Sequence, residues 1–165
     1  MSYRIFDAHC DTIGEILDKD KKLSASDLHI DLKRALMPKN SYVQVFAACA
    51  YGKGALERAV NLIDRYFLEV QRNESIVHCT SVSKIRKLSG ENKICSLLAI
   101  EGADAIESLE MLRLFYRLGV RILTLTWNYS NSISDGILEK RGAGLTDFGV
   151  SIIKEMNRIG IAIDV

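Results

Sequence analysis

Five apolar runs that favour β-strands alternate along the chain with segments of helical periodicity, and no tight hairpin joins any two of these runs. The run at 94–100 is apolar almost throughout, as is typical of a strand that is buried on both faces. Strands that are separated by helices pair in parallel through right-handed crossovers. The alternation therefore predicts an α/β fold around a parallel sheet. The five predicted strands are residues 4–9, 42–51, 94–100, 120–126 and 161–165.

Capping residues and chain breaks delimit the predicted helices. Thr146 or Asp147 caps the last helix, and Gly160 ends it. Pro38 breaks the chain after the second helix, because proline disfavours helical backbone at the residue before it. The predicted helices are residues 12–17, 27–36, 55–71, a segment that begins at Ser81 or Ser83 and ends at 88, residues 106–118, and a segment that ends at 159.

Composition excludes several classes of function. The chain has 165 residues, of which 48% are hydrophobic and 26% are charged, and its net charge is +1. This balance is ordinary for one soluble globular domain, and nucleic-acid binding requires a basic excess that is missing here. No apolar run approaches the ~18 residues of a membrane helix, and no secretory leader is recognisable. We therefore expect a cytoplasmic protein without nucleic-acid or membrane partners, whose four cysteines are free thiols.

A His-x-Asp pair follows the first apolar run. On a strand, alternate side chains share a face, so His9 and Asp11 are predicted to point the same way. An imidazole beside a carboxylate suits a divalent metal such as zinc. The alternative is a polar pair that is satisfied by its own hydrogen bonds. Cys10 has the opposite parity and is predicted to face away, and no paired histidine marks it as a nucleophile.

Glu101 ends the third apolar run and precedes a glycine. A carboxylate in such a place is costly to bury unless it is paired or bound to a metal. The alternative is an acid that is favoured by the dipole of the following helix. Chemistry-bearing residues at the ends of several parallel strands favour a (β/α)8 barrel of the TIM-barrel type over a doubly wound sheet, which fits the element order equally well. Only about five strands are present, so residues 1–165 are predicted to be part of a single barrel domain that they cannot close by themselves.

The segment at 127–143 is long and polar for a loop in a compact domain, and loops of this kind are often functional. Asn128 and Asn131 are candidate pocket-lining residues in it, and the alternative is that they hydrogen-bond the loop itself. His29 and His78 are predicted to have structural or surface roles.

Four passages together carry a resemblance to a known family. They are Asp-Ala-His-Cys-Asp at 7–11, Ile-Glu-Gly at 100–102, Leu-Gly-Val-Arg-Ile-Leu-Thr-Leu-Thr-Trp-Asn at 118–128, and the stretch from 144 to 165 that begins Gly-Leu-Thr-Asp-Phe-Gly. The chain resembles the N-terminal half of the membrane (renal-type) dipeptidases, the M19 metallopeptidases.

The resemblance implies a metallo-dependent hydrolase-like barrel that binds two zinc ions and hydrolyses the peptide bond of dipeptides, with a D-residue tolerated at the C-terminal position. In this family a hydroxide that bridges the two metals attacks the peptide carbon. His9 and Asp11 resemble the ligands of the first metal, and Glu101 resembles the catalytic carboxylate that bridges both metals. The family's second-metal histidines and its substrate-binding residues lie beyond Val165.

Two other functions stay open at this point. One is a catalytically incomplete half-barrel that needs a partner, because five strands cannot close and would leave open edges. The other is an amidohydrolase-like barrel that acts on a cyclic amide or lactone, although such barrels more often carry His-x-His after the first strand. The expected partners are a dipeptide substrate and either a second copy of the chain or a complementing C-terminal half.

Overall fold

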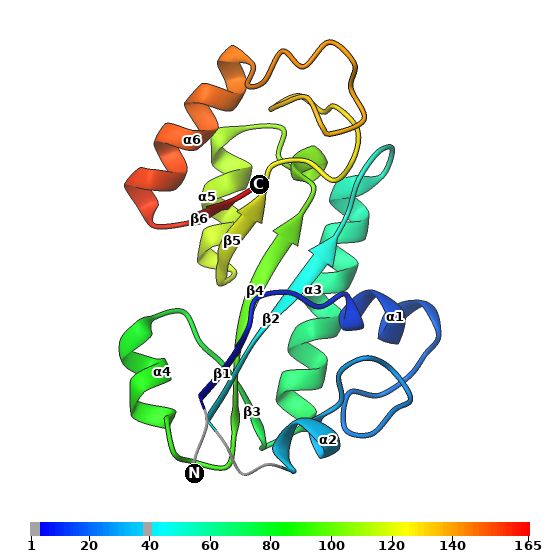
Figure 1. The fold of residues 1–165 in the computed structure, drawn as a ribbon, viewed down its shortest axis with the longest axis vertical. Helices are drawn as coiled ribbons and strands as arrows, with labels where there is room; N and C mark the ends of the chain where they lie inside the picture. The colour runs from blue at the N-terminus through cyan, green and yellow to red at the C-terminus, as the bar shows by residue number, and fades with distance from the viewer. Residues whose placement is uncertain (1–3, 38–40) are drawn as a thin grey trace. The chain divides into compact units, whose positions relative to one another are not determined.

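Strands and helices alternate along the whole of the computed structural model, which describes residues 4–37 and 41–165 (Figure 1). The predicted break at Pro38 lies outside these described residues. Within them, no helix combines the length and the apolar character that crossing a bilayer demands. The elements are β1 (Arg4–Asp7), α1 (Thr12–Asp18), α2 (Leu32–Leu36), β2 (Ser41–Cys49), α3 (Ala55–Arg72), β3 (Ile76–His78), α4 (Val82–Leu88), β4 (Ile94–Glu101), the 3-10 helix η1 (Ala103–Ala105), α5 (Leu109–Arg117), β5 (Val120–Thr124), α6 (Asp147–Ile159) and β6 (Ala162–Asp164).

The chain divides into two compact units. The first comprises Met1–Ala48 and Asn61–Leu98, where the sheet order is β1-β2-β4 and β3 also pairs with β4. The second comprises Cys49–Val60 and Ala99–Val165, where the end of β4 is followed in the sheet by β5 and β6. The β1–β2, β3–β4 and β5–β6 pairs are all parallel, as the alternation of strands and helices predicts.

Strand β3 was not predicted from the sequence. It spans only Ile76–His78 and pairs with β4 at the edge of the first unit's strand path. Three residues are too few to show a period of two, and the preceding Asn73 belongs to a polar turn segment. The five predicted strands therefore omit β3. The other five strands of the described residues overlap the predicted ranges, and most of them end earlier than predicted.

Two helices begin later than predicted, because the residue that caps each of them lies further along the chain. α2 begins at Leu32, after Asp31, whose carboxylate accepts a hydrogen bond from the Arg34 amide at 2.9 Å. α5 begins at Leu109, after Ser108, whose hydroxyl accepts from the Met111 amide at 3.2 Å. Each cap satisfies an amide that has no partner inside the helix, and this selects the start of the helix.

In the first unit, a buried acid on α3 holds the loop that follows α1. Glu69 accepts a hydrogen bond from the backbone amide of Leu23 at 2.9 Å and pairs with Arg65 at 3.2 Å. The Arg65 guanidinium in turn donates to the carbonyl of Lys21. Because Glu69 is almost completely buried, these partners are what makes its charge tolerable there. The polar segment predicted as a loop is thus tied to α3.

In the second unit, α5 and α6 lie beside β5 and β6 and pack against each other (Figure 1). α6 begins after Thr146, whose hydroxyl accepts from the Gly149 amide at 2.9 Å, and it ends at Gly160 with φ of +88°. Both ends agree with the sequence prediction. Glu155 of α6 pairs with Arg113 of α5 at 2.5 Å and with Arg158 at 2.6 Å.

The Glu155 cluster makes the stability of the second unit sensitive to acid. The guanidinium groups of Arg158 and Arg113 lower the pKa of Glu155 from 4.5 to about 2. A group whose pKa is lower in the folded state stabilises the fold above its unfolded pKa, and this contribution is lost as the pH falls through the folded value. We expect Glu155→Gln to lower the melting temperature at pH 7, and the difference from the wild-type chain to vanish between about pH 4.5 and pH 2. Circular dichroism melts across this range, with Glu74→Gln as the exposed control, check this; a difference that is independent of pH would contradict it.

Candidate functional site

His9 and Asp11 lie just beyond the end of β1 rather than within it. β1 ends at Asp7, opposite Gln44 of β2. The amide of Cys10 donates to the Val45 carbonyl at 3.0 Å, and the Cys10 carbonyl accepts from the Ala47 amide at 2.9 Å, which places Cys10 opposite residue 46. From Asp7 to Cys10 the first segment advances by three residues, whereas β2 advances by two, from residue 44 to residue 46. One extra residue on one side of a strand pair is the mark of a β-bulge. The strand predicted over 4–9 ends two residues earlier than expected, at Asp7, because the extra residue interrupts the regular hydrogen-bond ladder with β2.

The bulge nevertheless leaves the two candidate ligands side by side. His9 Nε2 lies 3.5 Å from Asp11 Oδ2, and the two side chains are 42% and 57% exposed. Cys10, between them, is buried, and this burial raises the pKa of its thiol to about 12. A buried, protonated thiol is a poor nucleophile, whereas the imidazole and the carboxylate face solvent together.

Glu101 belongs to the second unit, where it is the last residue of β4 and is half-buried. Its carbonyl accepts a hydrogen bond from the Ala50 amide at 3.0 Å. Gly102 follows with φ of +84°, and a Cβ on it would lie 3.0 Å from the Ala50 carbonyl oxygen. Only glycine adopts this backbone easily, so Gly102 turns the chain directly after the carboxylate. The next α-helix begins at Leu109, after the 3-10 helix η1, so Glu101 lies just before η1 and eight residues before α5. The interpretation of Glu101 as an acid near a helix N-terminus stays a prediction.

A second carboxylate in the same unit joins two loops. Asp104, in η1, accepts from the Gly52 amide at 3.0 Å and from the Asn131 side-chain amide at 3.2 Å. Asn131 also donates to the Leu125 carbonyl at 2.8 Å, and its oxygen accepts from the amides of residues 133 and 134. Asp104 thus links the segment after β2 to the segment after β5, and Asn131 bonds the loop. The pocket-lining role of Asn131 and Asn128 stays a prediction.

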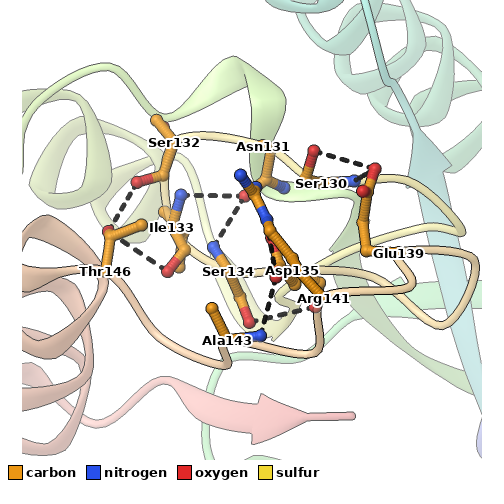
Figure 2. A network of polar contacts seen from close by, with 10 residues as sticks. All are labelled: Ser130, Asn131, Ser132, Ile133, Ser134, Asp135, Glu139, Arg141, Ala143 and Thr146. Carbon is orange, nitrogen blue, oxygen red and sulfur yellow. Dashed lines mark hydrogen bonds and ion pairs between the residues drawn. The ribbon is translucent and has the colours of Figure 1, made fainter.

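The long loop between β5 and α6 is held by its own polar side chains (Figure 2). Asp135 pairs with Arg141 at 2.6 Å and accepts from the Ala143 amide at 2.8 Å, and the Arg141 guanidinium lowers the pKa of Asp135. The hydroxyl of Ser130 donates to Glu139 at 3.0 Å. A loop with this many internal hydrogen bonds has a defined conformation although it has no helix or strand.

The remaining two histidines belong to the first unit. His29 is exposed in the loop before α2. His78, at the end of β3, is half-buried, and its Nδ1 lies 2.7 Å from the Tyr66 hydroxyl, which is also 2.6 Å from Ser96 Oγ. Burial raises the pKa of Tyr66. This polar cluster joins α3, β3 and β4 of the unit, which is the structural role predicted for His78.

Sequence reasoning missed Asp104, Tyr51 and Trp127. The rings of Tyr51 and Trp127 are stacked, with centroids 4.1 Å apart and planes 10° apart. Tyr51 follows the carboxyl end of β2, and Trp127 follows the carboxyl end of β5. Their places just after predicted strands were the sequence signal that could have identified them.

One family model matches the whole length of the chain. The family model described as membrane dipeptidase, peptidase family M19, matches residues 1–165. Dipeptidase 3 of Rattus norvegicus is 40% identical over 84 residues, which are 47% of this chain and 17% of that protein. The match therefore covers well under two thirds of the length of the curated relatives.

Solved structures confirm the fold class. Dipeptidase AC, a metallopeptidase of family M19, superimposes with a TM-score of 0.84 at 20% identity, over 99% of this chain and 56% of that chain. A metallopeptidase from Rhodobacter sphaeroides, liganded with a phosphinate mimic of the dipeptide L-Ala-D-Ala, superimposes with a TM-score of 0.84 at 19% identity, over 99% of this chain and 58% of that chain. The predicted α/β fold of the TIM-barrel type is therefore correct.

The Asp104 link between the two loops generates a prediction about stability. Asp104→Ala removes the acceptor for the Gly52 amide and for the Asn131 side chain, and we expect it to lower the free energy of unfolding by roughly 1–3 kcal/mol. Urea unfolding followed by the fluorescence of Trp127, the single tryptophan, measures this. Glu107→Ala, which alters an exposed acid three residues away, is the control and should stay within about 0.5 kcal/mol of the wild-type chain. Equal effects of the two changes would mean that the link contributes nothing.

Proposed function

Because this chain belongs to the membrane dipeptidases, peptidase family M19, we propose that it provides metal ligands for a zinc-dependent dipeptidase. The observation that carries the proposal is the His9–Asp11 pair at the end of β1, with nitrogen and oxygen donors 3.5 Å apart and open to solvent. The family match over residues 1–165 supports it. The activity of the 165-residue chain alone is part of what the experiments below decide.

The chemistry of the donors fits zinc. His9, Asp11 and Glu101 each offer one ligand atom, an imidazole nitrogen or a carboxylate oxygen, and zinc binds both kinds. We propose that His9 and Asp11 hold one ion and that Glu101 is shared by two. What supports grouping them is the family match over residues 1–165, because the resemblance to that family implies these three residues as its ligands. Bound in pairs, metal ions polarise a carbonyl and lower the pKa of a water molecule.

The residues of the chain have separable roles in this proposal. His9 binds metal only as the neutral imidazole, and Asp11 beside it supplies the negative charge that offsets the cation. The peptide group that follows Glu101 is held on both of its sides, because its carbonyl accepts from the Ala50 amide and its amide, on Gly102, donates to the Thr124 carbonyl. We propose that this fixes the backbone from which the carboxylate projects. A fixed, preorganised ligand costs less reorganisation during the reaction.

The substrate class is proposed from the relatives. The Rhodobacter sphaeroides metallopeptidase is liganded with a mimic of L-Ala-D-Ala, and we propose dipeptides as substrates here, including those with a D-residue at the C-terminal position. A second copy of the chain or a complementing C-terminal half is proposed as the partner that completes the site. The cytoplasmic location stays a prediction.

Zinc binding is the first test of the site. We expect calorimetric titration of the metal-free chain with zinc to give saturable binding, and His9→Ala or Glu101→Ala to weaken it at least about tenfold, since each removes a ligand. Glu107→Gln is the matched control for the carboxylate changes, because it removes an exposed carboxylate that is not a proposed ligand. Weakening by the control equal to that by the ligand changes would contradict the assignment.

Hydrolysis of Ala-D-Ala by the zinc-loaded chain is the second test. We expect any turnover to fall at least about a hundredfold in Glu101→Ala, because the proposed bridging carboxylate is lost. Two zinc ions per chain with turnover would mean that other ligands come from an assembled partner. One ion or none, without turnover, would mean that the chain holds the first-metal ligands but is not an enzyme by itself. Turnover that survives Glu101→Ala would contradict the proposed role of Glu101.

A further inference from the structure

A stacked pair of aromatic rings lies at the strand ends of the second unit. Tyr51 follows β2 and Trp127 follows β5, and their rings are 4.1 Å apart and nearly parallel. The ring centroid of Tyr129 is 6.1 Å from that of Trp127, and the planes of these two rings are tilted by 56°. Tyr51 is 49% exposed and Tyr129 is 59% exposed, whereas Tyr66 of the core is fully buried. The pair therefore presents aromatic surface to solvent instead of filling the core.

Backbone hydrogen bonds place this pair across the end of β4. The Ala50 amide, one residue before Tyr51, donates to the Glu101 carbonyl at 3.0 Å. The amides of residues 102 and 103 donate to the carbonyls of residues 124 and 125, three and two residues before Trp127, at 3.2 and 3.3 Å. A Cβ on Gly102 would lie 3.6 Å from the Cβ of Tyr51. The stacked rings therefore come from the two segments that flank Glu101 and Gly102.

The loops that carry the two rings are also joined to each other. Asp104 accepts from the Gly52 amide, next to Tyr51, and from the side chain of Asn131, four residues after Trp127. The Asn131 side chain donates to the carbonyl of Leu125, two residues before Trp127. These bonds hold both ring-bearing segments at fixed positions, so a ligand that meets the rings does not have to order them first.

We propose that the Tyr51–Trp127 pair is a side-chain subsite that selects dipeptides with an aromatic residue. This inference rests on the proposed function, because the ligand is the dipeptide whose peptide bond would lie at Glu101. Trp127 stacks on one face of the Tyr51 ring, and because Tyr51 is half-exposed, its ring offers further aromatic surface to a second aromatic group. Stacked aromatic pairs gain more than their buried area alone provides, whereas an aliphatic side chain gains only from area.

The single tryptophan makes the subsite observable without catalysis. The fluorescence of Trp127 in the 165-residue chain is followed during titration with Gly-Phe and, separately, with Gly-Leu. The two dipeptides have side chains of comparable size, but only that of Gly-Phe is aromatic. We expect a saturable change in emission with both and a Kd about threefold to tenfold lower for Gly-Phe. Tyr51→Leu, which keeps bulk but has no ring, should abolish the preference, and Tyr51→Phe should keep it.

Equal Kd values for the two dipeptides in the wild-type chain, or a preference for Gly-Phe that persists in Tyr51→Leu, would overturn the inference. A second measurement separates its failure from failure of the proposed function. Under conditions in which zinc-dependent hydrolysis is observed, the ratio of kcat/KM for Gly-Phe over Gly-Leu should fall to about one in Tyr51→Leu, chiefly through KM. Hydrolysis with an unchanged ratio would overturn the subsite and leave the proposed function standing. A fluorescence preference for Gly-Phe in a chain whose zinc binding does not depend on His9 or Glu101 would support the subsite and overturn the proposed function.

Discussion

Backbone hydrogen bonding that continues past the ends of the strands is the constraint on which the candidate site depends. In the first unit the amide and carbonyl of Cys10 bond to β2 after β1 has ended. In the second unit Glu101 and Gly102 bond to the segments on either side of β4. A backbone amide or carbonyl that is buried without a partner is costly, so these bonds determine the path of the chain at the strand ends. The polar side chains there are placed by that path.

The two units meet this constraint in different ways. The first inserts a bulge between Asp7 and Cys10, which buries the thiol and leaves His9 and Asp11 exposed together. The second uses the left-handed backbone of Gly102, which no other residue adopts as easily. Bulges and left-handed glycines are frequent beside functional sites, because they direct a side chain that regular structure would direct elsewhere.

Polar side chains then stabilise the loops that leave the strand ends. In the second unit Asp104 joins two such loops, and Asp135 with Arg141 holds a third stretch in one conformation. In the first unit Glu69 does the same for the loop after α1. None of these acids is a candidate metal ligand. Each of them accepts hydrogen bonds from groups that it holds in place in a loop. The exposed Asp11 carboxylate instead lies beside the His9 imidazole.

The sequence by itself determined the alternation of the five main strands with helices, the parallel class of the sheet and the positions of His9, Asp11 and Glu101 at or just beyond strand ends. These follow from local periodicity and capping, which act over a few residues and so leave a signal in the sequence. The tertiary structure alone decided the bulge before Cys10, the Asp104 link and the stacking of Tyr51 on Trp127. The last two are contacts between residues tens of positions apart, and the bulge appears only when β1 is compared with its partner strand. Such contacts have no period, and only the folded chain brings their members together.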